Sequence, residues 1–288
     1  MKNFLKRCLE FQSILGIDTS FDFVTGRDFF NQIINNNKYK KIEQLDDIVS
    51  NIYEEKNKLP NKLNKNSQYN NQLNKTITPD YDKQIIKNDF NANIDISNIK
   101  DFNDLEQAIQ NIDNCDLKRY AKNTVIYDGN KNAKIMLIGE APGVSEDQEG
   151  IPFCGQSGKL LRKALKYIKL DTTNLFITNT IYWRPPENRK PTEEELEICH
   201  PFMLKMIEII NPKIIILCGA TAIESILKIK QKISQLTGKF YTTNINSTQT
   251  KLFPIYHPSY LLRQPSIKKI FWEHLLILEK EIQKTLSV

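Results

Sequence analysis

Three short segments of this chain each place polar side chains directly after an apolar run that is typical of a buried strand. Residues 135–155 continue such a run into a loop that is rich in Gly and Pro and carries carboxylates and one aromatic ring. Residues 177–179 end on an amide, and residues 255–259 include a histidine. In an open α/β sheet, ligands bind outside the carboxyl ends of the parallel strands. The three segments therefore predict one pocket that combines an acid, an amide, an imidazole and an aromatic ring.

The elements that position these segments follow from the apolar pattern. Short apolar runs without alternation are typical of parallel strands that are covered on both faces, and they occur at residues 134–139, 175–179, 213–218 and 251–256. Helical patterns occupy residues 157–168, 192–210, 220–230 and 266–285. Thr192 and Glu195 have the spacing of a capping box at the start of the second helix. The alternation predicts a three-layer α/β/α sandwich with a central, mostly parallel four-stranded sheet.

The composition divides the chain into three parts. Residues 1–50 have helical periodicity and predict a small helical segment. Residues 51–98 include a stretch rich in Asn and Lys without apolar periodicity, which predicts a disordered linker whose composition is best explained by the base composition of the genome. Residues 99–288 predict the globular domain. The formal net charge of +6 permits binding to nucleic acid but does not demonstrate it.

Cysteine usage and the amino-terminal residues limit the class of protein. The five cysteines are scattered and include no Cys-x-x-Cys pair, so neither a disulfide framework nor a zinc site is expected. Charges within the first ten residues argue against a secretory signal, and no apolar run reaches the length of a membrane span. We therefore expect a cytoplasmic protein without a membrane partner.

The three segments resemble the motifs of the family-4 uracil-DNA glycosylases. The matches lie at residues 139–158, 178–191 and 257–263, in the family's order and on the expected strand ends. The resemblance covers about residues 110–280. It implies a DNA repair enzyme that flips uracil out of DNA, hydrolyses its N-glycosidic bond and so starts base excision repair. It also implies uracil-containing DNA as the partner and a monomeric enzyme.

The resemblance assigns the contacts to uracil. Phe153 would stack on the flipped base, and the amide of Asn179 would distinguish uracil from cytosine by pairing with O4 and N3–H. Gly139 and Ala141 complete the implied uracil-binding set. Two structural alternatives stay open, namely that Phe153 is a core residue and that Asn179 caps a turn.

The resemblance also implies the catalytic set. His257 would donate a hydrogen bond to the departing uracil, on which negative charge develops. Ala141 stands where better-known relatives carry the Asp that orients water, so Glu140 or Glu146 is expected to take that role. Asp147 lies beside them, and the sequence does not choose among these carboxylates. Glu140 could instead touch the base or orient its loop.

A third set of residues is implied to bind DNA. Leu261 and Leu262 resemble an apolar wedge that fills the space left by the flipped base, while Arg263 would hold a phosphate. Ser259 and Asn188 complete this set. The two leucines could instead begin a helix or pack in the core.

One departure from the family concerns its 4Fe–4S cluster, which four cysteines hold. Cys115 and Cys199 match two of the ligand positions, but Ile112 and Trp183 occupy the other two and cannot ligate iron. We therefore expect no cluster and no other cofactor, with an apolar plug and two free thiols in its place.

Three other functions are disfavoured by the sequence. A non-catalytic DNA-binding relative is disfavoured because Glu140, Phe153, Asn179 and His257 are all retained. An unrelated nucleotide or phosphate binder is disfavoured because the chain lacks both glycine-rich phosphate motifs. A relative that traps its product covalently through a histidine is disfavoured because residues 183–186 leave no room for the extra basic loop of such proteins.

Overall fold

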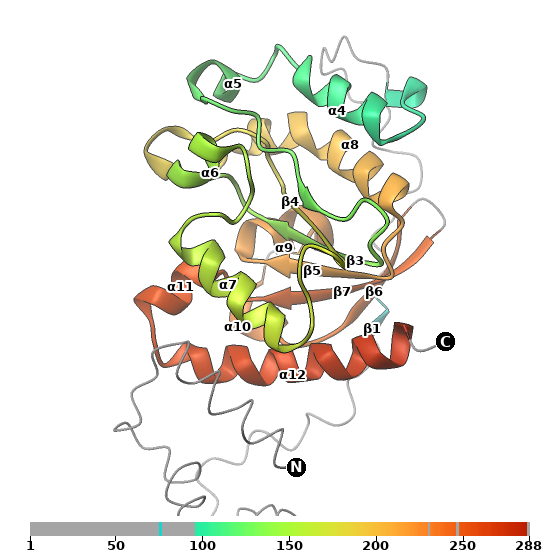
Figure 1. Cartoon of the computed structure of the whole chain (residues 1–288), viewed down its shortest axis with the longest axis vertical. Helices are drawn as coiled ribbons and strands as arrows, with labels where there is room; N and C mark the ends of the chain where they lie inside the picture. Colours follow the sequence, from blue (N-terminus) through green and yellow to red (C-terminus); the bar gives the residue numbers. More distant parts are fainter. Residues whose placement is uncertain (1–74, 77–95, 230, 246–247, 287–288) are drawn as a thin grey trace, which may run out of the picture. The chain divides into compact units, whose positions relative to one another are not determined.

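The computed structural model describes residues 75–76, 96–229, 231–245 and 248–286, which form a three-layer α/β/α sandwich (Figure 1). The helical segment expected at residues 1–50 lies outside the described residues, as does most of the linker expected at 51–98. All of the motif segments lie within the described part of the chain.

Four parallel strands form the centre of the sheet, as the apolar runs predict. They are β3 (Ile135–Gly139), β4 (Leu175–Asn179), β5 (Ile214–Cys218) and β7 (Thr248–Ile255), in the spatial order β7-β5-β3-β4. Every residue of β3, β4 and β5 is buried, because helices cover both faces. In the register of β3 with β4, Gly139 lies opposite Asn179. The first two motif segments therefore leave the sheet side by side.

Within the described residues, the sheet has seven strands rather than four. The additional strands are β6 (Tyr241–Ile245), antiparallel to β7, β1 (Lys75–Thr76), parallel to β6, and β2 (Asp128–Gly129), antiparallel to β4. β1 and β2 have only two residues each, which is too short for an apolar run. β6 alternates buried with more exposed residues, so it lacks the continuous run that identifies the central strands.

Helices cover both faces of the sheet (Figure 1). On one face, α4 (Phe102–Gln110), α8 (Glu193–Ile210) and α9 (Ala220–Leu227) share a hydrophobic core with β3, β4 and β5. On the other face lie α7 (Gln156–Tyr167) and α12 (Ile267–Leu286). The shorter helices are η2 (Ile96–Asn98), α5 (Leu117–Tyr120), α6 (Val144–Glu149), η3 (Pro186–Asn188), α10 (Ile233–Leu236) and α11 (Pro258–Arg263).

The capping box expected at α8 is present. The Thr192 hydroxyl accepts the Glu195 N–H at 3.2 Å, and the Glu195 carboxylate accepts the Thr192 N–H at 2.8 Å. Within the described part of the chain, no helix is both long enough and apolar enough to cross a membrane.

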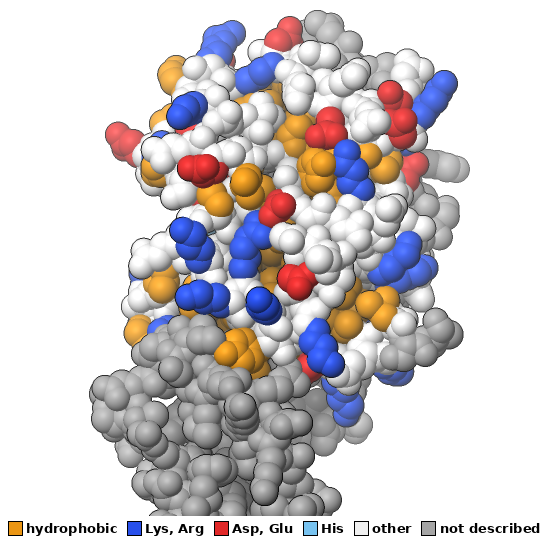
Figure 2. Space-filling view, viewed as in Figure 1, with side chains coloured by type: hydrophobic (Ala, Val, Ile, Leu, Met, Phe, Trp, Pro, Cys, Tyr) orange, Lys and Arg blue, Asp and Glu red, His pale blue; other side chains and the backbone are white. Residues whose placement is uncertain are grey.

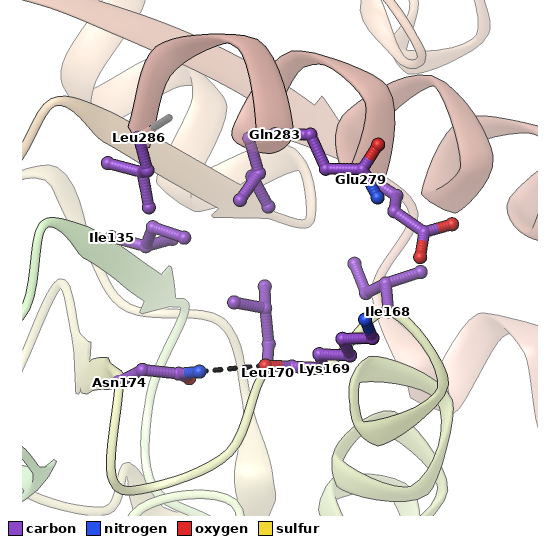
Figure 3. A pocket seen from close by; sticks show the side chains of 9 residues that line it. Ile135, Ile168, Lys169, Leu170, Asn174, Glu279, Gln283 and Leu286 are labelled. Atoms are coloured by element: carbon purple, nitrogen blue, oxygen red, sulfur yellow. Dashed lines mark hydrogen bonds between the residues drawn. The ribbon is translucent and has the colours of Figure 1, made fainter. Parts of the chain in front are cut away.

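A small pocket lies at the end of the sheet where β3 begins (Figure 3). Its volume is about 150 Å³, and it is bounded by Ile135, the loop after α7 and the end of α12. A hydrogen bond of 2.7 Å from Asn174 Nδ2 to the Lys169 carbonyl closes that loop. Ile135 begins β3 and Gly139 ends it, so this pocket lies at the opposite end of the strand from the motif residues.

Candidate active site

An amide and an aromatic ring both lie over the end of β3. A Cβ atom on Gly139 would lie 2.5 Å from Phe153 Cζ and closer still to Asn179 Oδ1. Such distances are shorter than any real Cβ contact, so only glycine allows both side chains to lie over this strand end.

The side chain of Asn179 is 2% exposed, and no hydrogen bond to its amide is found among the described residues. The alternative in which Asn179 caps a turn would require such a bond to the backbone. An amide without a protein partner is available to a ligand that brings its own donor and acceptor.

The backbone of Phe153 is held in an unusual conformation. Its φ is 54°, in the left-handed region that bulky residues rarely adopt. Gly158 lies directly against it, since a Cβ there would come within 2.5 Å of Phe153 Cα. A conformation of this kind persists only where the surroundings impose it, and it is common at ligand sites.

Arg162 on α7 supplies much of that restraint. Its Nε donates to the Phe153 carbonyl at 2.9 Å, and its Nη2 donates to the Pro152 carbonyl at 2.6 Å. The same Nη2 pairs with the Asp128 carboxylate at 2.6 Å. Arg162 was not predicted from the sequence, because an Arg inside a helix gives no sign of which distant carbonyls it will reach.

His257, in the third motif segment, lies near the Phe153 ring. It precedes α11, and its Nδ1 accepts the Ser259 N–H at 3.3 Å and lies 2.8 Å from Ser259 Oγ. Because Nδ1 accepts a backbone N–H, we assign the imidazole proton to Nε2. The ring centroid of His257 lies 6.2 Å from that of Phe153, with the planes at 35°.

The charge state of His257 follows from its surroundings. Burial is the main cause that lowers the pKa of His257 below its usual 6.5, and Arg263 lowers it further, while the carboxylates of Glu140 and Glu146 oppose this. The lowered pKa favours a neutral ring at pH 7, with Nε2–H as its donor. Gly219, with φ 97°, makes room for the ring, since a Cβ there would lie 3.1 Å from His257 Cβ.

The two candidate carboxylates differ in how their oxygens are used. Glu140 Oε2 accepts a hydrogen bond from Thr221 Oγ1 at 2.5 Å, and no partner of Glu140 Oε1 is found among the described residues. Both oxygens of Glu146 accept backbone N–H groups, from Gly155 at 2.8 Å and Gly143 at 3.2 Å. Glu146 thus ties the loop after β3 to the start of α7, and only Glu140 keeps a carboxylate oxygen for a ligand.

Two further polar residues serve the loops. Asp147 is buried, and its carboxylate accepts the backbone N–H groups of Lys122 at 2.8 Å and Asn123 at 3.2 Å. These contacts give Asp147 a structural role beside Glu146. Asn188 is exposed, and its Oδ1 accepts from Arg184 Nε at 2.8 Å. Ala141 is partly buried and packs against the hydrophobic core.

The structure separates the two leucines of the expected wedge. Leu262 is 40% exposed, and Arg263 beside it is also exposed. Leu261 is fully buried, so its expected contact with DNA is corrected to a packing role in the core. Successive residues of a short helix point in different directions, which a motif match does not resolve.

The two cysteines of the incomplete ligand set lie together in the core. The thiols of Cys115 and Cys199 are hydrogen-bonded, and this contact and burial raise the pKa of Cys199 well above its usual value. Ile112 and Trp183 are both at most 2% exposed in the same hydrophobic cluster. The described residues contain no group of three or more His, Cys, Asp or Glu side chains that could hold a metal. Four-thiolate ligation of an iron–sulfur cluster does not fit this arrangement.

Comparison with known proteins agrees with the site. Residues 126–276 match the model of the uracil DNA glycosylase superfamily, so the chain belongs to that superfamily. A type-4 uracil-DNA glycosylase of Pyrobaculum aerophilum is 37% identical over 179 residues, which cover 61% of this chain and 91% of that one. The type-4 enzyme of Saccharolobus solfataricus is 41% identical over 174 residues, 59% of this chain and 81% of that one. These similarities support assignment to the type-4 branch.

The Arg162 contacts lead to a testable prediction. Arg162→Lys keeps a positive charge near Asp128 but cannot reach both carbonyls in a fork, so the Phe153 ring should lose its fixed position. We expect uracil release under single-turnover conditions to slow by roughly 10- to 100-fold, as for misplacement of about 1 Å. Asp128→Asn is the matched control, because it leaves the two carbonyl contacts of Arg162 in place. It should slow uracil release by less than about threefold. Equal rates for Arg162→Lys and the parent would limit Arg162 to an ion-pair role.

Proposed function

We propose that this chain excises uracil from DNA by flipping the nucleotide into the pocket at the end of β3 and hydrolysing its N-glycosidic bond. The observation that carries the proposal is that the Asn179 amide and the Phe153 ring both lie over Gly139, with the His257 ring near that of Phe153. Release of free uracil from an oligonucleotide with a single uracil, against the same oligonucleotide with thymine, tests it. The expected monomeric state and cytoplasmic location stay predictions.

Recognition in this proposal depends on the unpaired amide. Nδ2 of Asn179 donates to uracil O4, and Oδ1 accepts from N3–H, while Phe153 stacks on the base. Cytosine presents an amino group and a bare ring nitrogen at these positions, so both contacts would be lost. A site built for two specific hydrogen bonds rejects a base that leaves its buried groups unpaired.

The chemistry in this proposal divides between His257 and Glu140. As the bond from the sugar C1′ to uracil N1 breaks, its electron pair moves onto the base, and Nε2–H of His257 donates to uracil O2. This contact strengthens as charge develops, so it lowers the barrier more than it tightens binding. A water held by Glu140 Oε1 attacks C1′ and loses a proton to that carboxylate. Glu146 acts as a positioning residue rather than as the base.

Binding of the duplex is assigned to the exposed end of α11 and to η3. Leu262 enters the space that the flipped nucleotide leaves, and Arg263 contacts a nearby phosphate. Ser259 orients His257, and Asn188 holds Arg184 at the surface. No step in this scheme uses a metal, because the apolar side chains of Ile112 and Trp183 stand where two cluster ligands would be needed.

The absence of a cluster is tested on the protein itself. Protein purified without exposure to oxygen should be colourless, without absorption near roughly 400 nm, and should contain little iron while it releases uracil. Stoichiometric iron in such preparations would contradict the cluster-free proposal. Cys115→Ser/Cys199→Ser serves as the control, since removal of both thiols should leave uracil release intact if they bind no cluster.

His257→Ala should slow turnover far more than it weakens DNA binding. Loss of one oxyanion-type donor costs about 100- to 1,000-fold in rate. Burial lowers the pKa of His257, so the neutral ring persists to more acidic pH than a free imidazole does. The turnover rate should therefore begin to decline only below the pH at which a free imidazole becomes protonated. A rate that rises on acidification would show that the protonated ring is the active form.

Asn179→Asp tests the base reader. The carboxylate repels uracil O4 and leaves one polar group unpaired, at about 1–3 kcal/mol each, so uracil release should fall at least roughly tenfold. Weak release of cytosine is a secondary outcome, since the new acceptor suits its amino group. Asn111→Asp makes the same change at the exposed end of α4 and should leave the rate unaltered. Unchanged uracil release by Asn179→Asp would contradict the reader role.

A further inference from the structure

The charge on α7 is entirely of one sign. Its twelve residues include Lys159, Arg162, Lys163 and Lys166 and no carboxylate. Arg162 is used internally, but Lys159 and Lys163 are exposed and lie one helical turn apart on the same face. Helix α11, which packs against α7, adds Arg263 and also has no carboxylate. Figure 2 shows Lys and Arg side chains gathered over the region where Figure 1 draws α7 and α11.

This arrangement does not serve the helix. Lys159 lies near the start of α7, where the helix dipole favours anions, and Lys163 four residues later adds like-charge repulsion. Neither lysine has an ion-pair partner among the described residues. Three other lysines pair with glutamates, namely Lys131 with Glu106, Lys205 with Glu208 and Lys251 with Glu281. An external polyanion would supply the charge that α7 lacks.

The position of α7 indicates which polyanion. The helix starts directly after the Phe153 loop, and its neighbour α11 carries the exposed Leu262 and Arg263. Lys159 and Lys163 are separated by about 6 Å along the helix axis. This separation is close to the distance between neighbouring phosphates of one DNA strand. We propose that the exposed face of α7 binds backbone phosphates of the duplex that flanks the flipped nucleotide. The choice of DNA as occupant rests on the proposed function.

Neutralising the two lysines tests this surface. Lys159→Gln/Lys163→Gln removes two positive charges from α7. Lys280→Gln/Lys284→Gln is the matched control, because it removes two charges at the same spacing from exposed positions of α12. This part of α12 lies near the start of β3, at the other end of the strand from the motif residues. The affinity for duplex DNA is measured between about 50 and 200 mM salt. Each phosphate contact contributes about 0.9 to the slope of log K against log salt, so the α7 variant should lose roughly 2 from the slope. The α12 variant should keep the parent slope.

The kinetic readout separates this surface from the active site. The α7 variant should raise KM, while kcat at saturating DNA stays within about twofold of the parent because neither lysine touches the base. Equal slopes for all three proteins, or equal losses in both variants, would overturn the proposal. If the parent releases no uracil but the slopes differ as expected, the proposed function fails and the DNA surface stands. If the parent releases uracil but the slopes are indistinguishable, the proposed function stands and the DNA surface on α7 fails.

Discussion

The absence of a side chain at Gly139 is the constraint on which the arrangement of the candidate site depends. The parallel register of β3 and β4 sets Gly139 opposite Asn179, and the loop from the same strand returns Phe153 over that point. A single methyl group would occupy the space in which the amide and the ring meet. The pocket is therefore defined by backbone register first and by side-chain chemistry second.

The supports of Phe153 show how this geometry is maintained. Its left-handed backbone is restrained by close contact with Gly158 and by the two carbonyl contacts of Arg162. Glu146 adds a third tie, because it joins the Gly143 and Gly155 N–H groups across the same loop. Residues that are not expected to touch a substrate thus fix the position of Phe153, which is proposed to stack on the base. Support of this kind is a general requirement for precise sites.

The sequence predicted the central sheet well, because the four inner strands are continuous apolar runs whose burial on both faces leaves a clear pattern. It missed β1 and β2, which exist only through pairing with a neighbour, and β6, which alternates. In the candidate site, the motif residues Phe153, Asn179 and His257 lie together as expected. Arg162 could not be found in this way, because its partners depend on tertiary geometry, and neither the burial of Leu261 nor the backbone ties of Glu146 follow from a motif.

The core around Trp183 has a consequence for how the domain reaches its native state. Ile112 and Trp183 pack with the paired thiols of Cys115 and Cys199, and the indole Nε1 donates to Thr124 Oγ1 at 3.0 Å. Apolar burial and the indole hydrogen bond therefore both contribute to closure of this core. In the cluster-free state that we propose, assembly of the domain requires no iron, and an oxidant that dismantles iron–sulfur centres has no centre to attack.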